Sequence, residues 1–148
     1  MENSIHKRIE IKAPVSRVWK ALTDYREFGA WFGVKVDAPF VVGKPATGEK
    51  TSGGCDGKPW NAVIVKMEPE RLFSYTWHPW SSGELSPGEK PNLVEFVLEP
   101  TKIGTLLKVT ETGFASLPQA RYDESFPKHT EGWTKQVENV ANHIAQNP

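Results

Sequence analysis

Acid–base chemistry is the reaction type for which this sequence offers the best side chains. Glu111 is the leading candidate, and His78 is the second. In the stretch LLKVTET, Glu111 alternates with Leu107 and Val109, so in a strand it would point inward with them. A buried carboxylate is costly unless it is paired, and burial can shift its pKa toward a catalytically useful value. Two interpretations remain open: a polar anchor at a cavity edge, or a solvated residue at a frayed strand end.

The other reactive side chains do not form a recognisable site. Cys55 is the single cysteine, which excludes an internal disulfide and a multi-cysteine zinc site. It lies in the glycine-rich turn GGCDG, where it could be exposed and oxidisable. The histidines lack the spacing of metal ligands; they are His6, His78, His129 and His143. The sequence has no nucleophile elbow, phosphate loop or dinucleotide fingerprint. We therefore predict no metal, no cofactor and no catalytic residue, and we keep an enzyme as an alternative.

Aromatic rings are the second chemical feature, concentrated in the stretch SYTWHPW at residues 74–80. In a strand, Phe73, Tyr75 and Trp77 share one face, and His78 lies on the other. Large rings belong on the inner face of a sheet, where the polar atoms of Tyr75 and Trp77 need hydrogen-bond partners. These rings could fill an ordinary core or line a cavity.

The cost of an empty cavity limits these alternatives. A dry void of roughly 300 Å³, the lower end for ligand pockets, would cost about 7 kcal/mol at about 24 cal/mol per Å³. Net protein stability is only about 5–15 kcal/mol. A cavity here would therefore hold water or a ligand, or would be partly filled by rings, and the sequence has 6 tryptophans to fill it.

Hydrophobic periodicity predicts the elements that position these residues. Alternating isoleucines predict a strand over 5–11, and the apolar spacing in PVSRVWKAL predicts a helix over 14–22. Asp24 with Glu27 predicts the start of a second short helix that runs toward Trp31. The remaining predicted strands are 39–44, 49–53, 59–67, 71–78, 92–100 and 104–112. The strongest helix prediction is 129–145, after a stretch of mixed signals over 114–127.

This order of elements predicts a single α+β domain over residues 1–148. Strands in an unbroken run favour antiparallel pairing between neighbours. A curved sheet would then close around the C-terminal helix, which is the only large amphipathic element.

Composition excludes several classes of partner. The chain has 18 Lys plus Arg and 18 Asp plus Glu, with a pI near 6.9, so no long-range field attracts nucleic acid or anionic lipid. The N-terminus does not resemble a secretory signal, and no apolar run is long enough to span a membrane. We expect a cytoplasmic protein that is a monomer or a homodimer.

The order and spacing of several motifs resemble a known family. They are the residues from Ile11 to Asp24, WFG at 31–33, EPERLFSYTW at 68–77, GTLLKVTETGF at 104–114, and EGW from Glu131. Together they are similar to the START-like (SRPBCC) superfamily, and within it to homologues of the activator of heat-shock protein 90 ATPase. The resemblance implies a helix-grip fold: about seven antiparallel strands around a long C-terminal helix, with two short helices after the first strand.

The resemblance also implies a cavity between the sheet and the long helix. We expect this cavity to bind a small hydrophobic or amphipathic molecule, with 81–91 or 114–127 as a lid. The candidate ligand-binding residues are Trp31, Phe32, Phe40, Tyr75, Trp77, Phe96, Glu111, Phe114 and Trp133. One alternative is a cavity-based enzyme of cyclase or hydrolase type that uses Glu111 or His78. Another is contact with a chaperone, although the eukaryotic co-chaperone has an additional N-terminal domain and this chain begins at its first strand.

Overall fold

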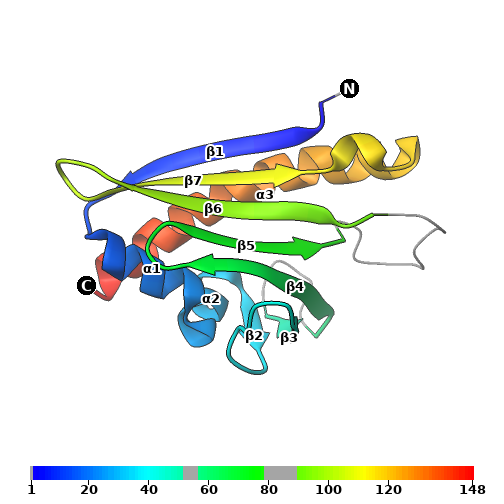
Figure 1. Ribbon diagram of the computed structural model, residues 1–148. Helices are drawn as coiled ribbons and strands as arrows, with labels where there is room; N and C mark the ends of the chain where they lie inside the picture. Colours follow the sequence, from blue (N-terminus) through cyan, green and yellow to red (C-terminus); the bar gives the residue numbers. More distant parts are fainter. Residues whose placement is uncertain (1, 52–56, 79–89) are drawn as a thin grey trace.

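The strands of this chain form one antiparallel sheet that curves over the long C-terminal helix (Figure 1). The structure is a computed structural model, and it describes residues 2–51, 57–78 and 90–148. The strand order is β1-β7-β6-β5-β4-β3-β2, and each pair is antiparallel. The predicted fold class, a helix-grip α+β fold, is confirmed. Cys55 and residues 81–89 of the expected lid lie outside the described residues.

The elements follow one another along the chain with short connections. Their bounds are β1 (Ser4–Ile11), α1 (Val15–Thr23), α2 (Tyr25–Phe32), β2 (Val34–Val36), β3 (Pro45–Lys50), β4 (Pro59–Glu68), β5 (Leu72–Trp77), β6 (Asn92–Pro100), β7 (Thr105–Thr112), the 3₁₀ turn η1 (Phe114–Ser116) and α3 (Gln119–Gln146).

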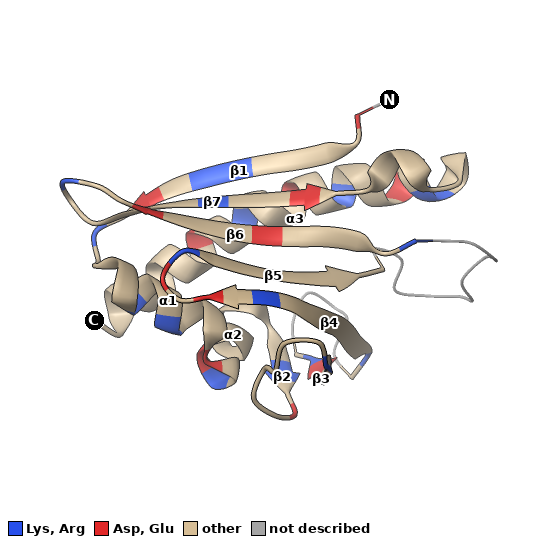
Figure 2. Cartoon of the chain, in the orientation of Figure 1, with Lys and Arg blue, Asp and Glu red and all other residues tan. Residues whose placement is uncertain are grey.

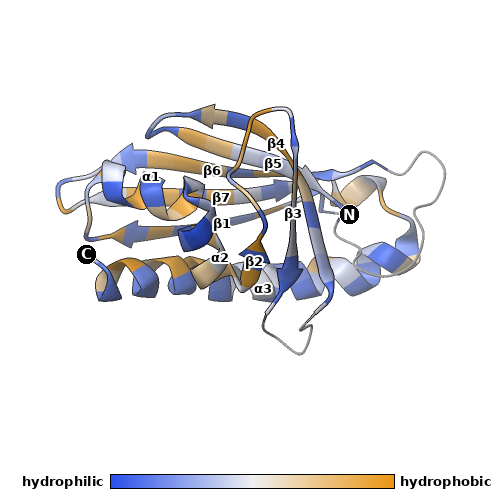
Figure 3. Cartoon of the chain, turned by 90° about the horizontal axis from the view of Figure 1, so that it is seen from below, coloured by the Kyte–Doolittle hydropathy of each residue, from blue (hydrophilic) through white to orange (hydrophobic). Residues whose placement is uncertain are grey.

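Alternation of apolar and polar residues determines the two faces of the sheet. In β7, Thr105, Leu107, Val109 and Glu111 are buried while the residues between them are half-exposed. β6 has the same pattern, as a strand with one face on the core must. Figure 3 shows the long helix running along this face. The sheet therefore has a concave inner surface that includes Glu111.

Asp24 and Gly33 cap the second short helix, α2, at its two ends. The Asp24 side chain accepts hydrogen bonds from the backbone N–H groups of Arg26 and Glu27, at 2.9 and 3.2 Å. This arrangement satisfies N–H groups that have no partner within the helix. Gly33 ends α2 with φ of 88°, a left-handed conformation that favours glycine. The predicted pair of short helices with a break between them is confirmed.

Helix α3 is longer than the sequence predicts. The pattern predicts a start near residue 129, whereas the helix begins at Gln119 and includes Pro127. Proline removes a backbone donor and usually ends a helix. For this reason the sequence pattern does not predict the turns of α3 that precede residue 129. Packing compensates locally, because the Phe126 ring lies 5.1 Å from those of both Tyr122 and Phe114. The stretch 114–127, one of the two segments expected as a lid, contains η1 and the first turns of α3.

The segment before β3 also differs from the prediction. The apolar run at 39–44 was predicted as a strand, but Val41 and Val42 are 54% and 52% exposed in a turn. The turn closes through a bond from Lys44 N–H to the Val41 carbonyl, next to Gly43 at φ of 81°. Only Phe40 of this run is buried. The strand β2 was missed, and β3 begins before the predicted 49–53.

Charges of both signs are interspersed over the outer surfaces of the strands and helices (Figure 2). This distribution agrees with the overall balance of charge in the sequence. In the part of the chain that the structure describes, no helix is both long enough and apolar enough to cross a membrane.

Candidate functional site

Glu111 lies on the inner face of the sheet, near the end of β7. Strand register places it beside Val94 of β6, and Val94 beside Tyr75 of β5. All three side chains are fully buried. The interpretation of Glu111 as a solvated residue at a frayed strand end is therefore wrong. The alternation of β7 continues to the end of the strand because β1 pairs with it as far as Thr112.

Among the described residues, the hydrogen bonds to the Glu111 carboxylate all come from nitrogen donors. Oε1 accepts from His129 Nδ1 at 2.7 Å and from Trp133 Nε1 at 2.8 Å. Oε2 accepts from Trp77 Nε1 at 2.8 Å and from Asn92 Nδ2 at 3.1 Å. An ionised carboxylate has about four acceptor positions, so these donors saturate it. This is the arrangement in which a buried carboxylate is tolerated.

The donors hold the carboxyl group in its ionised form. Burial alone raises the pKa of Glu111, but the hydrogen bond and charge of His129 and the indole N–H groups of Trp133 and Trp77 outweigh it. The resulting pKa lies below the ordinary value for glutamate. Asn92, Trp77 and Trp133 contribute uncharged donors, so His129 is the one titratable group among the described residues that donate to this carboxylate.

Three separate elements bring these donors together. Trp77 ends β5 and Asn92 begins β6, and the two residues pair across the strands. His129 and Trp133 lie four positions apart on α3, so they share one face of the helix. The carboxylate therefore joins the sheet to the long helix at one point.

The imidazole of His129 is partly exposed to solvent, although it contacts the buried Glu111 carboxylate. Its side chain is 19% exposed, whereas that of Glu111 is 0% exposed. The ring packs against Trp77 at 5.6 Å and Phe114 at 5.7 Å, both edge-on. Nδ1 faces the carboxylate, so Nε2, on the other side of the ring, is the nitrogen left for a ligand or solvent.

A pocket of about 130 Å³ lies beside this imidazole. It is lined by Phe32, Trp77, Lys128, His129, Gly132, Trp133 and Gln136. The centroids of Phe32, Trp77 and Trp133 are about 6 Å from one another. The pocket thus has aromatic walls, with polar groups supplied by α3.

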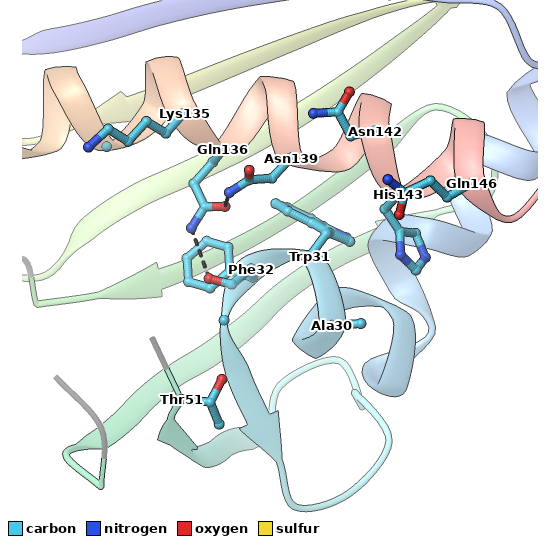
Figure 4. A pocket seen from close by; sticks show the side chains of 12 residues that line it. Ala30, Trp31, Phe32, Thr51, Lys135, Gln136, Asn139, Asn142, His143 and Gln146 are labelled. Atoms are coloured by element: carbon cyan, nitrogen blue, oxygen red, sulfur yellow. Dashed lines mark hydrogen bonds between the residues drawn. The ribbon is translucent and has the colours of Figure 1, made fainter. Parts of the chain in front are cut away.

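A larger groove continues from this pocket between α2 and α3. It has a volume of about 520 Å³ and shares Phe32, Gly132 and Gln136 with the pocket. Figure 4 shows α3 presenting amide side chains toward Trp31 and Phe32. Gln136 Nε2 donates to the backbone carbonyl of Phe32 at 2.9 Å, and this bond lies where the two spaces meet.

The structure brings some predicted ligand-binding residues together and separates others. Phe32, Trp77 and Trp133 line the pocket, and Glu111 lies behind it. Trp31 borders the groove, although it is 5% exposed. The rest fill the core; they are Phe40, Tyr75, Phe96 and Phe114.

Trp77 and Tyr75 were both expected to need hydrogen-bond partners, and the outcome differs between them. Trp77 finds a partner in Glu111, but the Tyr75 hydroxyl is buried and has no hydrogen-bond partner in the described structure. Burial, with the nearby charge of Glu111, raises the pKa of Tyr75 well above its usual value. His78, the second acid–base candidate, does not line the pocket.

Sequence reasoning missed His129 and Asn92. A signal for His129 was present, because its spacing from Trp133 places both on the same face of the predicted helix. For Asn92 no such signal exists, since only strand register brings it to the carboxylate. Within residues 2–51, 57–78 and 90–148, no group of three or more His, Cys, Asp or Glu residues could hold a metal ion.

The fold and this site define a START-like helix-grip protein. The chain belongs to the family described as Activator of Hsp90 ATPase homolog 1-like protein, whose model matches residues 12–145. A comparison with curated proteins gives no match.

Solved structures share this fold at low sequence identity. Protein MLL2253 from Mesorhizobium loti is 23% identical with a TM-score of 0.79, and the match covers 98% of each chain. DynU16, a putative protein in the dynemicin biosynthetic locus, is 21% identical with a TM-score of 0.76; the match covers 98% of this chain and 48% of that one. The Aha1 dimer from Colwellia psychrerythraea is 17% identical with a TM-score of 0.73, and 95% of each chain is covered.

Proposed function

We propose that this chain binds a small apolar or amphipathic ring compound in the pocket beside His129. The supporting observation is the pocket itself: three aromatic side chains converge next to one imidazole that a buried carboxylate holds in place. Small-molecule sites commonly combine apolar walls with a few oriented polar groups. The site lies where the sheet meets the C-terminal helix, which is the place expected from the family resemblance.

The size of the pocket indicates how the ligand is held. Aromatic side chains fill much of the core between the sheet and α3. A pocket of about 130 Å³ remains beside His129. The Trp77 and Trp133 ring centroids are 6.0 Å apart and the rings leave no space between them, so a small flat ring would pack against their pocket-facing sides, where a long acyl chain has too little room. A longer substituent would extend past Gln136 into the groove between α2 and α3, whose volume is about 520 Å³.

The polar groups at the wall define the amphipathic part of the ligand. His129, Lys128 and Gln136 are the polar residues that line the pocket. A hydroxyl or carbonyl oxygen on the ligand can pair with one of them, while its ring packs against the indoles. Aromatic contacts of this kind contribute about 0.5–1.5 kcal/mol beyond the buried area.

A fragment screen tests this function. Indole, naphthol and nitrobenzisoxazole are added to the full chain, and the melting temperature and native mass spectrum are recorded. A ligand at a hundred times its Kd stabilises the folded state by about 2.7 kcal/mol, so a binder raises the melting temperature.

The matched variants are Gly132→Leu and Thr134→Leu. A Cβ at Gly132 meets no atom within 4 Å, and Gly132 lines the pocket, so the leucine fills it. Thr134 is exposed on the same helix. Loss of the shift in Gly132→Leu alone supports the proposal; equal shifts in both variants, or no shift with any probe, overturn it.

A further inference from the structure

The described structure has two carboxylate–imidazole pairs, and their surroundings differ. His143 Nε2 lies 2.9 Å from Glu27 Oε1, but the same carboxylate also pairs with Arg17 at 2.8 Å. Its negative charge is therefore already balanced. The other pair is Glu111 with His129, where the remaining donors to the carboxylate in the described part of the chain are uncharged.

The hydrogen bond to Glu111 determines which nitrogen of His129 carries a proton. The ionised carboxylate is only an acceptor, so the hydrogen lies on Nδ1. In the neutral imidazole the lone pair is then on Nε2. Among the residues that the structure describes, none makes a hydrogen bond to Nε2, and the ring borders the pocket. A base with its lone pair toward a ligand and its other nitrogen on a carboxylate is a common arrangement for proton transfer.

We propose that His129 is a catalytic base in this pocket, and that Glu111 is its positioning residue. This proposal rests on the proposed binding function. The substrate class is a small ring compound with one acidic proton: a phenol, or a carbon acid next to a carbonyl group.

In the carbon-acid case, Nε2 takes the proton and the C–H electron pair becomes the enolate. The imidazolium then returns the proton to another atom of the same molecule. The net reaction is a tautomerisation, so it needs no co-reactant. Glu111 stabilises the imidazolium that forms between the two steps.

Few charged groups surround this base. From the sheet, the Glu111 carboxylate is the charged group in contact, and Trp77 contributes an uncharged ring. From η1, Phe114 contributes another ring. On α3 itself, Lys128 borders the pocket and pairs with Glu124 at 3.1 Å. The Tyr75 hydroxyl is buried near the carboxylate, and its raised pKa keeps it neutral.

Ring opening of nitrobenzisoxazole measures this base directly. A base removes the proton from the ring carbon, the C–H electrons complete a nitrile, and the N–O bond breaks to release a coloured phenolate. The full chain is expected to give a saturable rate above that of the same concentration of free imidazole, and the rate is recorded as a function of pH. Binding of the same probe is followed separately by quenching of tryptophan fluorescence.

The variants separate catalysis from folding. His129→Ala is expected to lower the rate at least tenfold, and added imidazole is expected to restore it saturably. His6→Ala, exposed on β1, controls for general effects of a lost histidine. Glu111→Gln should displace the pH profile, because the amide no longer holds Nδ1–H in place, and circular dichroism shows whether that variant folds.

The outcomes also separate this inference from the proposed function. A saturable rate that falls in His129→Ala and returns with imidazole supports the catalytic base. Probe binding with no rate above free imidazole, or a rate unchanged in His129→Ala, overturns the base but leaves the binding function standing. Failure of the probe to bind overturns the inference, and failure of every fragment overturns the proposed function as well.

Discussion

His129 and Trp133 lie one helical turn apart on α3, and both donate hydrogen bonds to the same oxygen of Glu111. The other oxygen accepts bonds from Trp77 and Asn92 at the ends of two strands. One ionised side chain therefore joins the sheet to the helix that it grips. The same contacts fix the imidazole that borders the pocket.

Replacing Glu111 should be among the most damaging single changes in the chain. Glu111→Gln leaves an amide N–H₂ facing other donors, and each buried donor left unsatisfied costs about 1–3 kcal/mol. Glu99→Gln is the control, because Glu99 and its partner Lys108 are 48% and 44% exposed. Such surface pairs contribute about 0–1 kcal/mol. Urea unfolding measures both variants, and a similar loss in each would contradict the account.

Two tryptophans with equal burial allow the indole hydrogen bond to be measured. Trp133 and Trp60 are both 3% exposed, but the buried Nε1 atom of Trp60 has no hydrogen-bond partner among the described residues. Substitution by phenylalanine removes similar ring area from each, whereas only Trp133→Phe loses a bond to Glu111. Hydrogen bonds to charged groups contribute about 1.5–3 kcal/mol. Trp133→Phe should therefore cost more than Trp60→Phe by about this amount in chemical unfolding, and an equal cost would contradict the assignment.

The Glu27 cluster predicts a specific pH dependence of stability. Burial raises the pKa of Glu27, but bonds from His143 and Arg17 outweigh it and lower the pKa in the folded chain. The unfolded value is about 4.3, so the cluster contributes fully above that pH. The contribution is lost as the pH falls through the lower folded pKa.

Glu27→Gln should therefore lower stability near neutral pH by about 1.5–3 kcal/mol and make the acid limb of the stability curve less steep. Urea unfolding across the acid range compares it with the unchanged chain. Parallel curves for the two proteins would show that Glu27 titrates alike in the folded and unfolded states.

Two glycines should respond in opposite directions to substitution by alanine. At Gly132 an added Cβ has open space, and alanine is favoured over glycine in helices by about 0.8–1 kcal/mol. At Gly113 the backbone has φ of 123°, and the Cβ would lie 2.5 Å from Asn92 Oδ1. That position should cost about 1–3 kcal/mol. Thermal unfolding of Gly132→Ala and Gly113→Ala tests the contrast, and destabilisation of Gly132→Ala would mean that the space beside α3 is already filled.

The sequence predicts the inner face of the sheet well, because alternation in β6 and β7 is regular. It places Glu111 inward with Leu107 and Val109, as the structure does. The partners of Glu111 depend on strand register, which brings residues far apart in sequence to one row. Local patterns do not encode that register, so Asn92 could not be found.

Two predictions from local sequence patterns, the start of α3 and the strand at 39–44, were wrong because tertiary packing outweighs local preference. Pro118 and Pro127 suggested a break before α3, whereas Pro118 caps the helix and Pro127 lies within it. The apolar residues Val41 and Val42 suggested a strand, but a turn at Gly43 leaves them exposed. The helix periodicity of α3 did predict the burial of Trp133 and Val137.

The most direct test of the central claim is a titration of the indole N–H signals in a nitrogen–proton NMR spectrum. Nitrobenzisoxazole or naphthol is added to the full chain, and the signals are assigned by single Trp→Phe variants. The account predicts saturable shifts at Trp77 and Trp133, whose rings border the pocket, and little change at Trp19, which does not line it. Shifts at Trp19 as large as those at Trp77, or no saturable shift at Trp77 and Trp133, would contradict a binding site beside His129.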